Sequence, residues 1–258
     1  MLLPFVYSDR SSLYEHDRLN RHHTQAGGIG DARLSAYAWI WDPATKPNGN
    51  LQVGLGFKVP TGDYKATDTF ISATGPVTGY VDQSIQPGDG GWGFTLELNG
   101  WRKLFDKTFA YAQGFYLFNP QDENGAPTTT GAFSRGNPYE QITSIPDQYM
   151  LRAGLSYVLL PSWGLQLSLG GRVEGVPVED VIGDNTGFRR PGFSVGIEPG
   201  ISLMKNKWTV SLTAPVALYR NRERSIADQR WSADSGTYRH GDAAFADYVI
   251  TFTVAREF

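Results

Sequence analysis

Apolar and polar residues alternate with a period of two through most of this 258-residue chain. Between Leu51 and Val59 every second residue is apolar, and the residues between them are glycine or polar. Successive side chains of a strand point to opposite faces, so the pattern predicts strands with one apolar and one polar face. The alternation recurs at 92–99, 149–159, 163–172, 193–202, 208–218 and 248–254, and less cleanly at 1–7, 31–41 and 108–118. These segments predict about ten strands of roughly ten residues each.

A helical membrane protein is excluded, because no window holds the roughly 18 consecutive apolar residues that a spanning helix needs. The mean hydropathy of -0.33 would suit a soluble protein. Alternating strands conceal a lipid-facing surface from such an average, so it does not decide the class. Residues 1–7 lack the pattern of a signal peptide, so for an exported protein the numbering would start after that signal.

Short and long connections alternate along the chain. Short ones are expected at 42–49, 104–107, 161–162 and 205–207, and long polar ones at 8–30, 61–90, 119–147, 176–191 and 220–242. Outer-membrane barrels have tight periplasmic turns and long outer loops, whereas a soluble sandwich or propeller has no reason to keep its long loops at one end. The chain is therefore predicted to be all-β, a single antiparallel transmembrane β-barrel domain over 1–258 that sits in the lipid bilayer of a bacterial outer membrane.

Large aromatic residues lie at the short-turn ends of the predicted strands. They are Trp41, Trp101, Trp163, Trp208, Phe105 and Phe258. Amphipathic rings favour the membrane interface, which predicts a periplasmic girdle, and the alternative is the aromatic core of a soluble β protein. Trp41 and Trp101 have the wrong parity for the outward face, so either a bulge, for example at Gly100, intervenes or these two rings point inward.

Six charged residues fall on the predicted inward face: Lys58, Glu97, Arg152, Arg172, Glu174 and Glu198. Charges within a spanning strand are tolerated where they face water or one another. One hypothesis is a charged constriction that selects solutes, and the other is a salt-bridge network that fills a closed interior. Inward glycines such as Gly54 and Gly170 would leave space there or serve the curvature of the strands.

Other chemistry finds little support in the sequence. A net charge of -3 and a pI near 5.8 offer no basic surface for nucleic acid. The absence of cysteine removes disulfides and thiolate metal sites. His16, His22, His23 and His240 lie in predicted outer loops near acidic residues, but their spacing matches no known metal site, and the acidic stretch 180–185 is a weak calcium candidate. No catalytic residues, metal or cofactor are predicted.

Several segments carry a resemblance to a known family. They are Gly28 to Asp31, Val59 to Gly62, Gly187 to Gly192, Glu198 to Gly200 and Pro215 to Arg222. Together they resemble the outer-membrane, transporter-like family described as phenol-degradation meta-pathway proteins. The resemblance implies a barrel of ten to twelve strands that serves as a channel for small hydrophobic or aromatic compounds. The C-terminal alternation from Tyr248 to Phe258, interrupted by Arg256, resembles the signal that barrel-assembly machinery binds.

The expected function is therefore passive passage of small molecules through an outer-membrane barrel. Two alternatives stay open. One is a closed structural or interaction barrel within a larger envelope complex. The other is a hydrolase at the outer rim, which would need a nucleophile beside His240.

Overall fold

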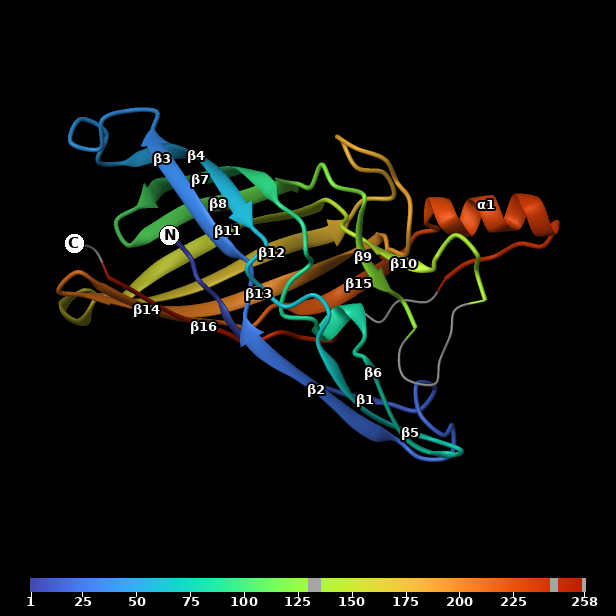
Figure 1. Cartoon of the computed structure of the whole chain (residues 1–258). Helices are drawn as coiled ribbons and strands as arrows, with labels where there is room; N and C mark the ends of the chain where they lie inside the picture. The colour runs from blue at the N-terminus through green and yellow to red at the C-terminus, as the bar shows by residue number, and fades with distance from the viewer. Residues whose placement is uncertain (130–135, 242–245, 257–258) are drawn as a thin grey trace.

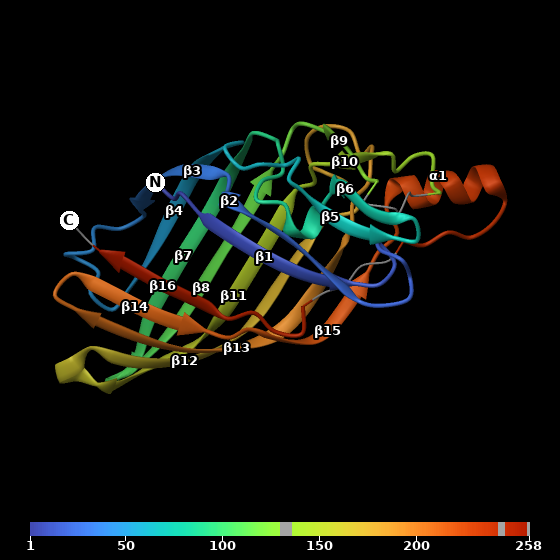
Figure 2. The same ribbon diagram turned by 60° about the horizontal axis from the view of Figure 1, so that its bottom comes forward.

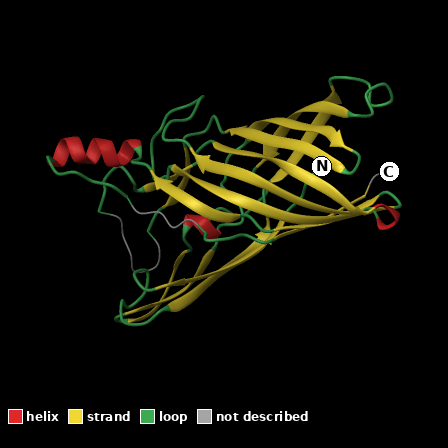
Figure 3. Ribbon diagram, turned by 180° about the vertical axis from the view of Figure 1, so that it is seen from behind, coloured by secondary structure: helices red, strands yellow, loops and turns green. Residues whose placement is uncertain are grey.

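The computed structural model describes residues 1–129, 136–241 and 246–256. Most of the described chain is strand, as Figure 3 shows, and all the ladders between named strands are antiparallel. The all-β prediction is therefore confirmed. Phe258 lies outside the described residues, so its predicted place at the end of the last strand stays a prediction. Among the described residues, no helix is both long enough and apolar enough to cross a membrane.

Ten strands form the main sheet, which runs in the order β16-β14-β13-β12-β11-β8-β7-β4-β3, with β15 also paired to β13. Their bounds are β3 (Ala32–Trp39), β4 (Gly49–Val59), β7 (Gly93–Phe105), β8 (Thr108–Phe118), β11 (Gln148–Leu160), β12 (Leu165–Val176), β13 (Gly192–Lys205), β14 (Trp208–Thr213), β15 (Val216–Arg222) and β16 (Thr251–Arg256). Neighbours in the sheet are also neighbours in sequence, apart from the small hairpins inserted between some of them and from β15 and a helix between β14 and β16. The sheet is thus an up-and-down meander.

The two faces of the sheet differ as the alternation predicts. On β4, β11 and β12 the outward residues Leu55, Leu155 and Leu169 are 66%, 52% and 59% exposed. Lys58 and Glu198, on the other face, are 4% and 2% exposed. A contiguous exposed apolar surface of this kind marks contact with another apolar phase or partner.

The main sheet is curled into an open half-barrel (Figures 1 and 2). The curl is deep enough that Arg33 on β3 lies over the ring of Phe115 on β8, three strands away in the sheet, at 5.6 Å from its centroid. We call the polar face the concave face and the apolar face the convex face. Within the described residues no ladder joins β16 to β3, and only an isolated bridge links Leu2 to Arg33 on the β3 side. A closed barrel is therefore not seen.

Hairpins and a helix occupy segments that were expected to be polar loops. β1 (Phe5–Ser12) pairs with β2 (His22–Ile29), β5 (Thr67–Ser72) with β6 (Gly75–Tyr80), and β9 (Glu123–Pro127) with β10 (Ile142–Ser144). Helix α1 spans Ile226–Ser235, and a 3-10 turn spans Gln83–Ile85. The loop prediction is wrong on this point, because polar hairpins carry no apolar alternation that would reveal them. These elements gather at the long-loop end of the sheet (Figure 1).

A small apolar core lies among the hairpins of the long-loop end. Ala26, Val81 and Ile85 are buried together, with Ala66 packed against them. Phe70, on β5, is also fully buried. These hairpins therefore form a packed cap and not a set of free loops.

The segment 208–218, predicted as one strand, is split into β14 and β15 at Ala214 and Pro215. Proline has no N–H to donate, and Pro199 stands nearby in the middle of β13. One hydrogen bond, from the Ala214 N–H to the Pro199 carbonyl (3.0 Å), spans the break. Two prolines in neighbouring strands thus interrupt the ladder at one place.

The short-turn end has tight connections. The turn Pro161–Trp163 ends at Gly164 with φ of 65°, where an added Cβ would collide with the Met204 carbonyl. Trp163 and Trp208 are exposed there, beside the cations of Lys205 and Arg256. Both rings thus lie at the short-turn end, and the girdle at a membrane interface stays a prediction.

The register decides between the two alternatives left open for Trp101. Leu51 pairs with Gly100 and Asn50 with Trp101 without interruption, so Gly100 carries no bulge. Trp101 therefore shares the concave face with Glu97. Trp41 and Trp101 line one cavity of about 460 Å³ with the connection at 45–50. Trp101 thus faces the concave side at the short-turn end, and Trp41, which is 48% exposed, lies across this cavity from it.

Candidate functional site

The concave face carries an ion-pair cluster centred on Glu198. Arg152 and Arg172 stand directly opposite each other in the β11–β12 ladder, an arrangement that destabilises a sheet when it is uncompensated. Glu198, on the neighbouring β13, accepts from both. Its Oε1 lies 2.5 Å from Nη1 of Arg152, and its Oε2 lies 2.8 Å from Nη1 of Arg172. One acid therefore offsets a like-charge pair that the strand register imposes.

Two further side chains extend this cluster. Glu174 accepts from Nη2 of Arg172 at 2.5 Å, and Gln113 accepts from Nε of Arg152 at 2.7 Å. Glu174 is partly exposed, whereas Glu198 is buried. The cluster thus spans β8, β11, β12 and β13, and it is more exposed to solvent at Glu174 than at Glu198.

Glu97 belongs to a separate cluster on β3 and β7. It accepts hydrogen bonds from the hydroxyl groups of Tyr37 (2.6 Å), Thr95 (2.9 Å) and Ser35 (3.1 Å). The ring of Tyr37 lies where a Cβ of Gly54 would stand, and Tyr111 does the same at Gly170. The space beside these two inward glycines is therefore taken by tyrosine side chains.

Lys58 forms a third charged group at the long-loop end of β4. It pairs with Asp89, which lies in the connection before β7. Directly across the β3–β4 ladder from Lys58 stands Arg33. The six predicted inward charges thus fall into three groups: Arg152, Arg172, Glu174 and Glu198 together, Glu97 apart, and Lys58 beside the cap.

Two adjoining cavities lie over the concave face, and the second of them is also lined by the cap. The first, of about 290 Å³, is lined by Arg172, Glu174, Ser194 and Tyr248 among others. The second, of about 420 Å³, is lined by Arg33, Lys58, Tyr64 and Tyr80 among others. Gln148, Val176 and Arg190 line both cavities and so stand at their boundary. Arg152, Glu198 and Glu97 do not line either one.

Arg190 at this boundary is held by Asp82. The two side chains make a bidentate pair, with Nη1 and Nη2 of Arg190 at 2.8 and 2.7 Å from the two carboxylate oxygens. Arg10 of β1 adds a second ion pair to Asp82 at 2.6 Å. Burial alone would raise the pKa of Asp82, but Arg190 and Arg10 outweigh it and hold that pKa well below its usual range. The carboxylate therefore stays charged, and its contribution to stability is lost only as the pH falls through that depressed pKa.

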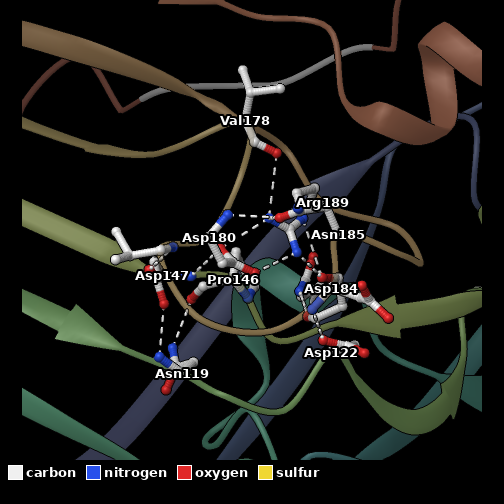
Figure 4. A network of polar contacts seen from close by, with 12 residues as sticks. Asn119, Asp122, Pro146, Asp147, Val178, Asp180, Asp184, Asn185 and Arg189 are labelled. Carbon is white, nitrogen blue, oxygen red and sulfur yellow. Dashed lines mark hydrogen bonds and ion pairs between the residues drawn. The ribbon is translucent and has the colours of Figure 1, made fainter.

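A second anchor of the cap is the fully buried Arg189. Its guanidinium donates to both oxygens of Asp180, to Oγ of Ser144 and to Asn185 (Figure 4). Asp180 in turn accepts from the N–H of Asp147 at 2.8 Å. A buried arginine with this many partners ties the connection 177–191 to β10 and the segment that follows it.

The same network continues to β8 through Asp147. Its carboxylate accepts from the N–H group of Asn119 at 2.7 Å (Figure 4). It also accepts from the N–H group of Val181 at 2.9 Å. Asn119 also donates its side-chain amide to the Pro146 carbonyl. Three connections of the long-loop end are thereby fixed to one another.

The contacts of the histidines are to backbone groups, carboxylates and neighbouring rings. His16 is buried, and its Nδ1 accepts from the Ile71 N–H; burial, followed by His22, lowers its pKa. His22 pairs with Asp17, and His23 with Asp9. No group of three or more metal-ligating side chains occurs in the described residues. Asp180, which belongs to the acidic stretch 180–185 named as a weak calcium candidate, forms an ion pair with Arg189.

Sequence reasoning missed the cap anchors Asp82, Arg189 and Arg190. The only signal was the segment Gly187 to Gly192, which was noted for its resemblance and contains both arginines. Two more of the noted segments meet in space. Gly62 donates its N–H to Asp31 at 2.9 Å, and Thr61 donates its hydroxyl to the Gly30 carbonyl.

No protein-family model matches this chain, and no curated protein matches it. The family named from the sequence segments therefore stays a prediction. The functional proposal is therefore based on the geometry of the concave face.

Proposed function

We propose that this chain is a bacterial outer-membrane β-barrel protein that lets small molecules pass along its concave face. In this proposal the convex face contacts lipid, and the long-loop end with its cap faces outward. The C-terminal strand is the segment that barrel-assembly machinery would bind. The resemblance to the phenol-degradation meta-pathway family supports a transport role.

The observation that carries the proposal is the contrast between the two faces of one curled sheet. An exposed apolar convex face suits a hydrocarbon solvent, and a charged concave face suits water. Two adjoining cavities occupy the concave side between the cap and the Glu198 cluster. A water-filled route with a charged wall would select solutes by size and charge.

A closed barrel that serves structure or interaction within an envelope complex is the second candidate. It is favoured by the cap, whose anchors Arg189 and Asp82 hold several connections over the sheet. The hydrolase alternative gains nothing from the described residues, because the one contact of the His240 ring with a polar group is to the Gly241 carbonyl. It is not pursued.

Reconstituted liposomes test the passage directly. We expect the native protein to admit a monosaccharide much faster than a trisaccharide, because the cavities measure only a few hundred Å³. The chain has no cysteine, so a single thiol can be placed on either face. A bulky maleimide on Ser194→Cys, which lines the first cavity, should slow entry several-fold.

Leu155→Cys on the convex face is the matched control, and its modification should leave solute entry unchanged. Entry no faster than into protein-free liposomes would favour the closed structural barrel. Equal effects of the maleimide at the two positions would contradict passage along the concave face.

A further inference from the structure

Arg33 is an uncommitted cation in the wall of the second cavity. Each other charged side chain that lines this cavity has a partner: Lys58 pairs with Asp89, Asp82 with Arg190, and Asp31 accepts from two backbone N–H groups. Arg33 has no ion pair and no side-chain hydrogen bond within the described residues. Its guanidinium lies over the ring of Phe115.

The strand register makes this position unusual. Arg33 and Lys58 are directly opposite each other on β3 and β4, so two positive charges stand side by side. Like charges at such positions are unfavourable unless an acid offsets them, as Glu198 does for Arg152 and Arg172. At the Arg33 position, Asp89 is committed to Lys58. The opposed pair Arg33 and Lys58 therefore has no shared carboxylate of the kind that Glu198 provides for Arg152 and Arg172.

Glu97, the acid of the neighbouring cluster on β3 and β7, does not supply it. Glu97 acts on Arg33 electrostatically without an ion pair, and its oxygens accept from Tyr37, Thr95 and Ser35. The N–H donors of the planar Arg33 guanidinium are thus available to an acceptor from outside the chain. Such a fork of donors matches a carboxylate in two parallel hydrogen bonds.

The surroundings of Arg33 suit an apolar body attached to that carboxylate. Tyr64, Tyr80 and Leu117 line the same cavity, and Phe115 lies under the guanidinium. The volume of about 420 Å³ falls in the range of roughly 300 to 1,000 Å³ that small-molecule pockets occupy. The wall combines these apolar side chains with charged and polar ones, so it offers contacts to both parts of such a molecule.

We infer that the second cavity binds a small organic monocarboxylate, whose carboxylate pairs with Arg33 and whose apolar body lies against Leu117 and the cap tyrosines. The inference rests on the proposed function, since it names the class of molecule that would enter the route. It assigns Arg33 the role of a selectivity residue. It also explains why a cation is kept beside Lys58 without an acid of its own.

Binding of hexanoate and hexanamide to the purified protein in detergent micelles, measured by titration calorimetry, tests this inference. The two probes share an apolar chain and differ in charge. We expect the native protein to bind hexanoate at least tenfold more tightly than hexanamide. Arg33→Gln should abolish that preference and leave the affinity for hexanamide unchanged, and Arg33→Lys, which keeps the charge without the fork, should retain part of it.

Arg102→Gln, which removes an exposed cation at the short-turn end, is the matched control and should behave as native. Equal affinities of the native protein for both probes, no detectable hexanoate binding, or an intact preference in Arg33→Gln would each overturn the inference. The assay requires no flux across a membrane. Hexanoate binding without solute entry would therefore refute the proposed passage while the site stands.

Discussion

Replacing Glu198 by glutamine is expected to lower the free energy of unfolding by about 3 to 5 kcal/mol, the usual cost of removing one partner from a buried ion pair. Glu198 is 2% exposed and is the acid that Arg152 and Arg172 share. Glutamine keeps the shape but leaves two opposed cations, of which only Arg172 retains another acid, Glu174. Reversible urea unfolding into lipid vesicles measures the loss.

Glu174→Gln is the control for this variant. Its side chain is 38% exposed and pairs with Arg172 alone. Exposed pairs contribute only about 0 to 1 kcal/mol, so its effect should be small. Similar losses for the two variants would mean that Glu198 does not hold strands β11, β12 and β13 together electrostatically.

Placing arginine on the convex face should also be costly. Leu155→Arg, near the middle of β11, is expected to destabilise the protein by about 2 to 4 kcal/mol, because the charge would enter hydrocarbon. Its neighbour Ser156 points to the concave face, where the new charge could reach water. Ser156→Arg should therefore cost distinctly less, again in reversible unfolding into lipid vesicles. Equal penalties would contradict a lipid-facing convex surface.

The strands could be predicted because the period of two is a local property. The alternation from Leu51 to Val59 determines both the strand and its faces, and the same parity puts Arg152, Arg172 and Glu198 on one face of successive strands. Only the pairing partners required the structure. The register then settled Trp101, which a parity count alone had left open.

The cap could not be predicted, because it depends on contacts between distant segments. Asp82 and Arg190 are 108 residues apart, and nothing local to either residue indicates the other. Helix α1 has no apolar stripe, and only its capping box at Ser225 and Asp228 and the glycine at Gly236 indicate it.

The selectivity proposal depends on the same kind of contact. Arg33 meets Phe115 because the sheet curls across three strands, and strand periodicity does not specify how far a sheet curls. The position of Arg33 opposite Lys58 likewise came from the strand register and not from the sequence. The second cavity thus depends both on the curvature of the main sheet and on the cap.

The current carried by the native protein in a planar lipid bilayer tests the central claim most directly. A route along the concave face predicts discrete conductance steps, and the reversal potential under a salt gradient should move toward cation selectivity in Arg172→Ala, which removes a positive charge from the first cavity. The shift should shrink at high salt, since the Debye length falls from about 10 Å at 0.1 M to about 3 Å at 1 M. A native protein that inserts into the bilayer and carries no current would contradict the account.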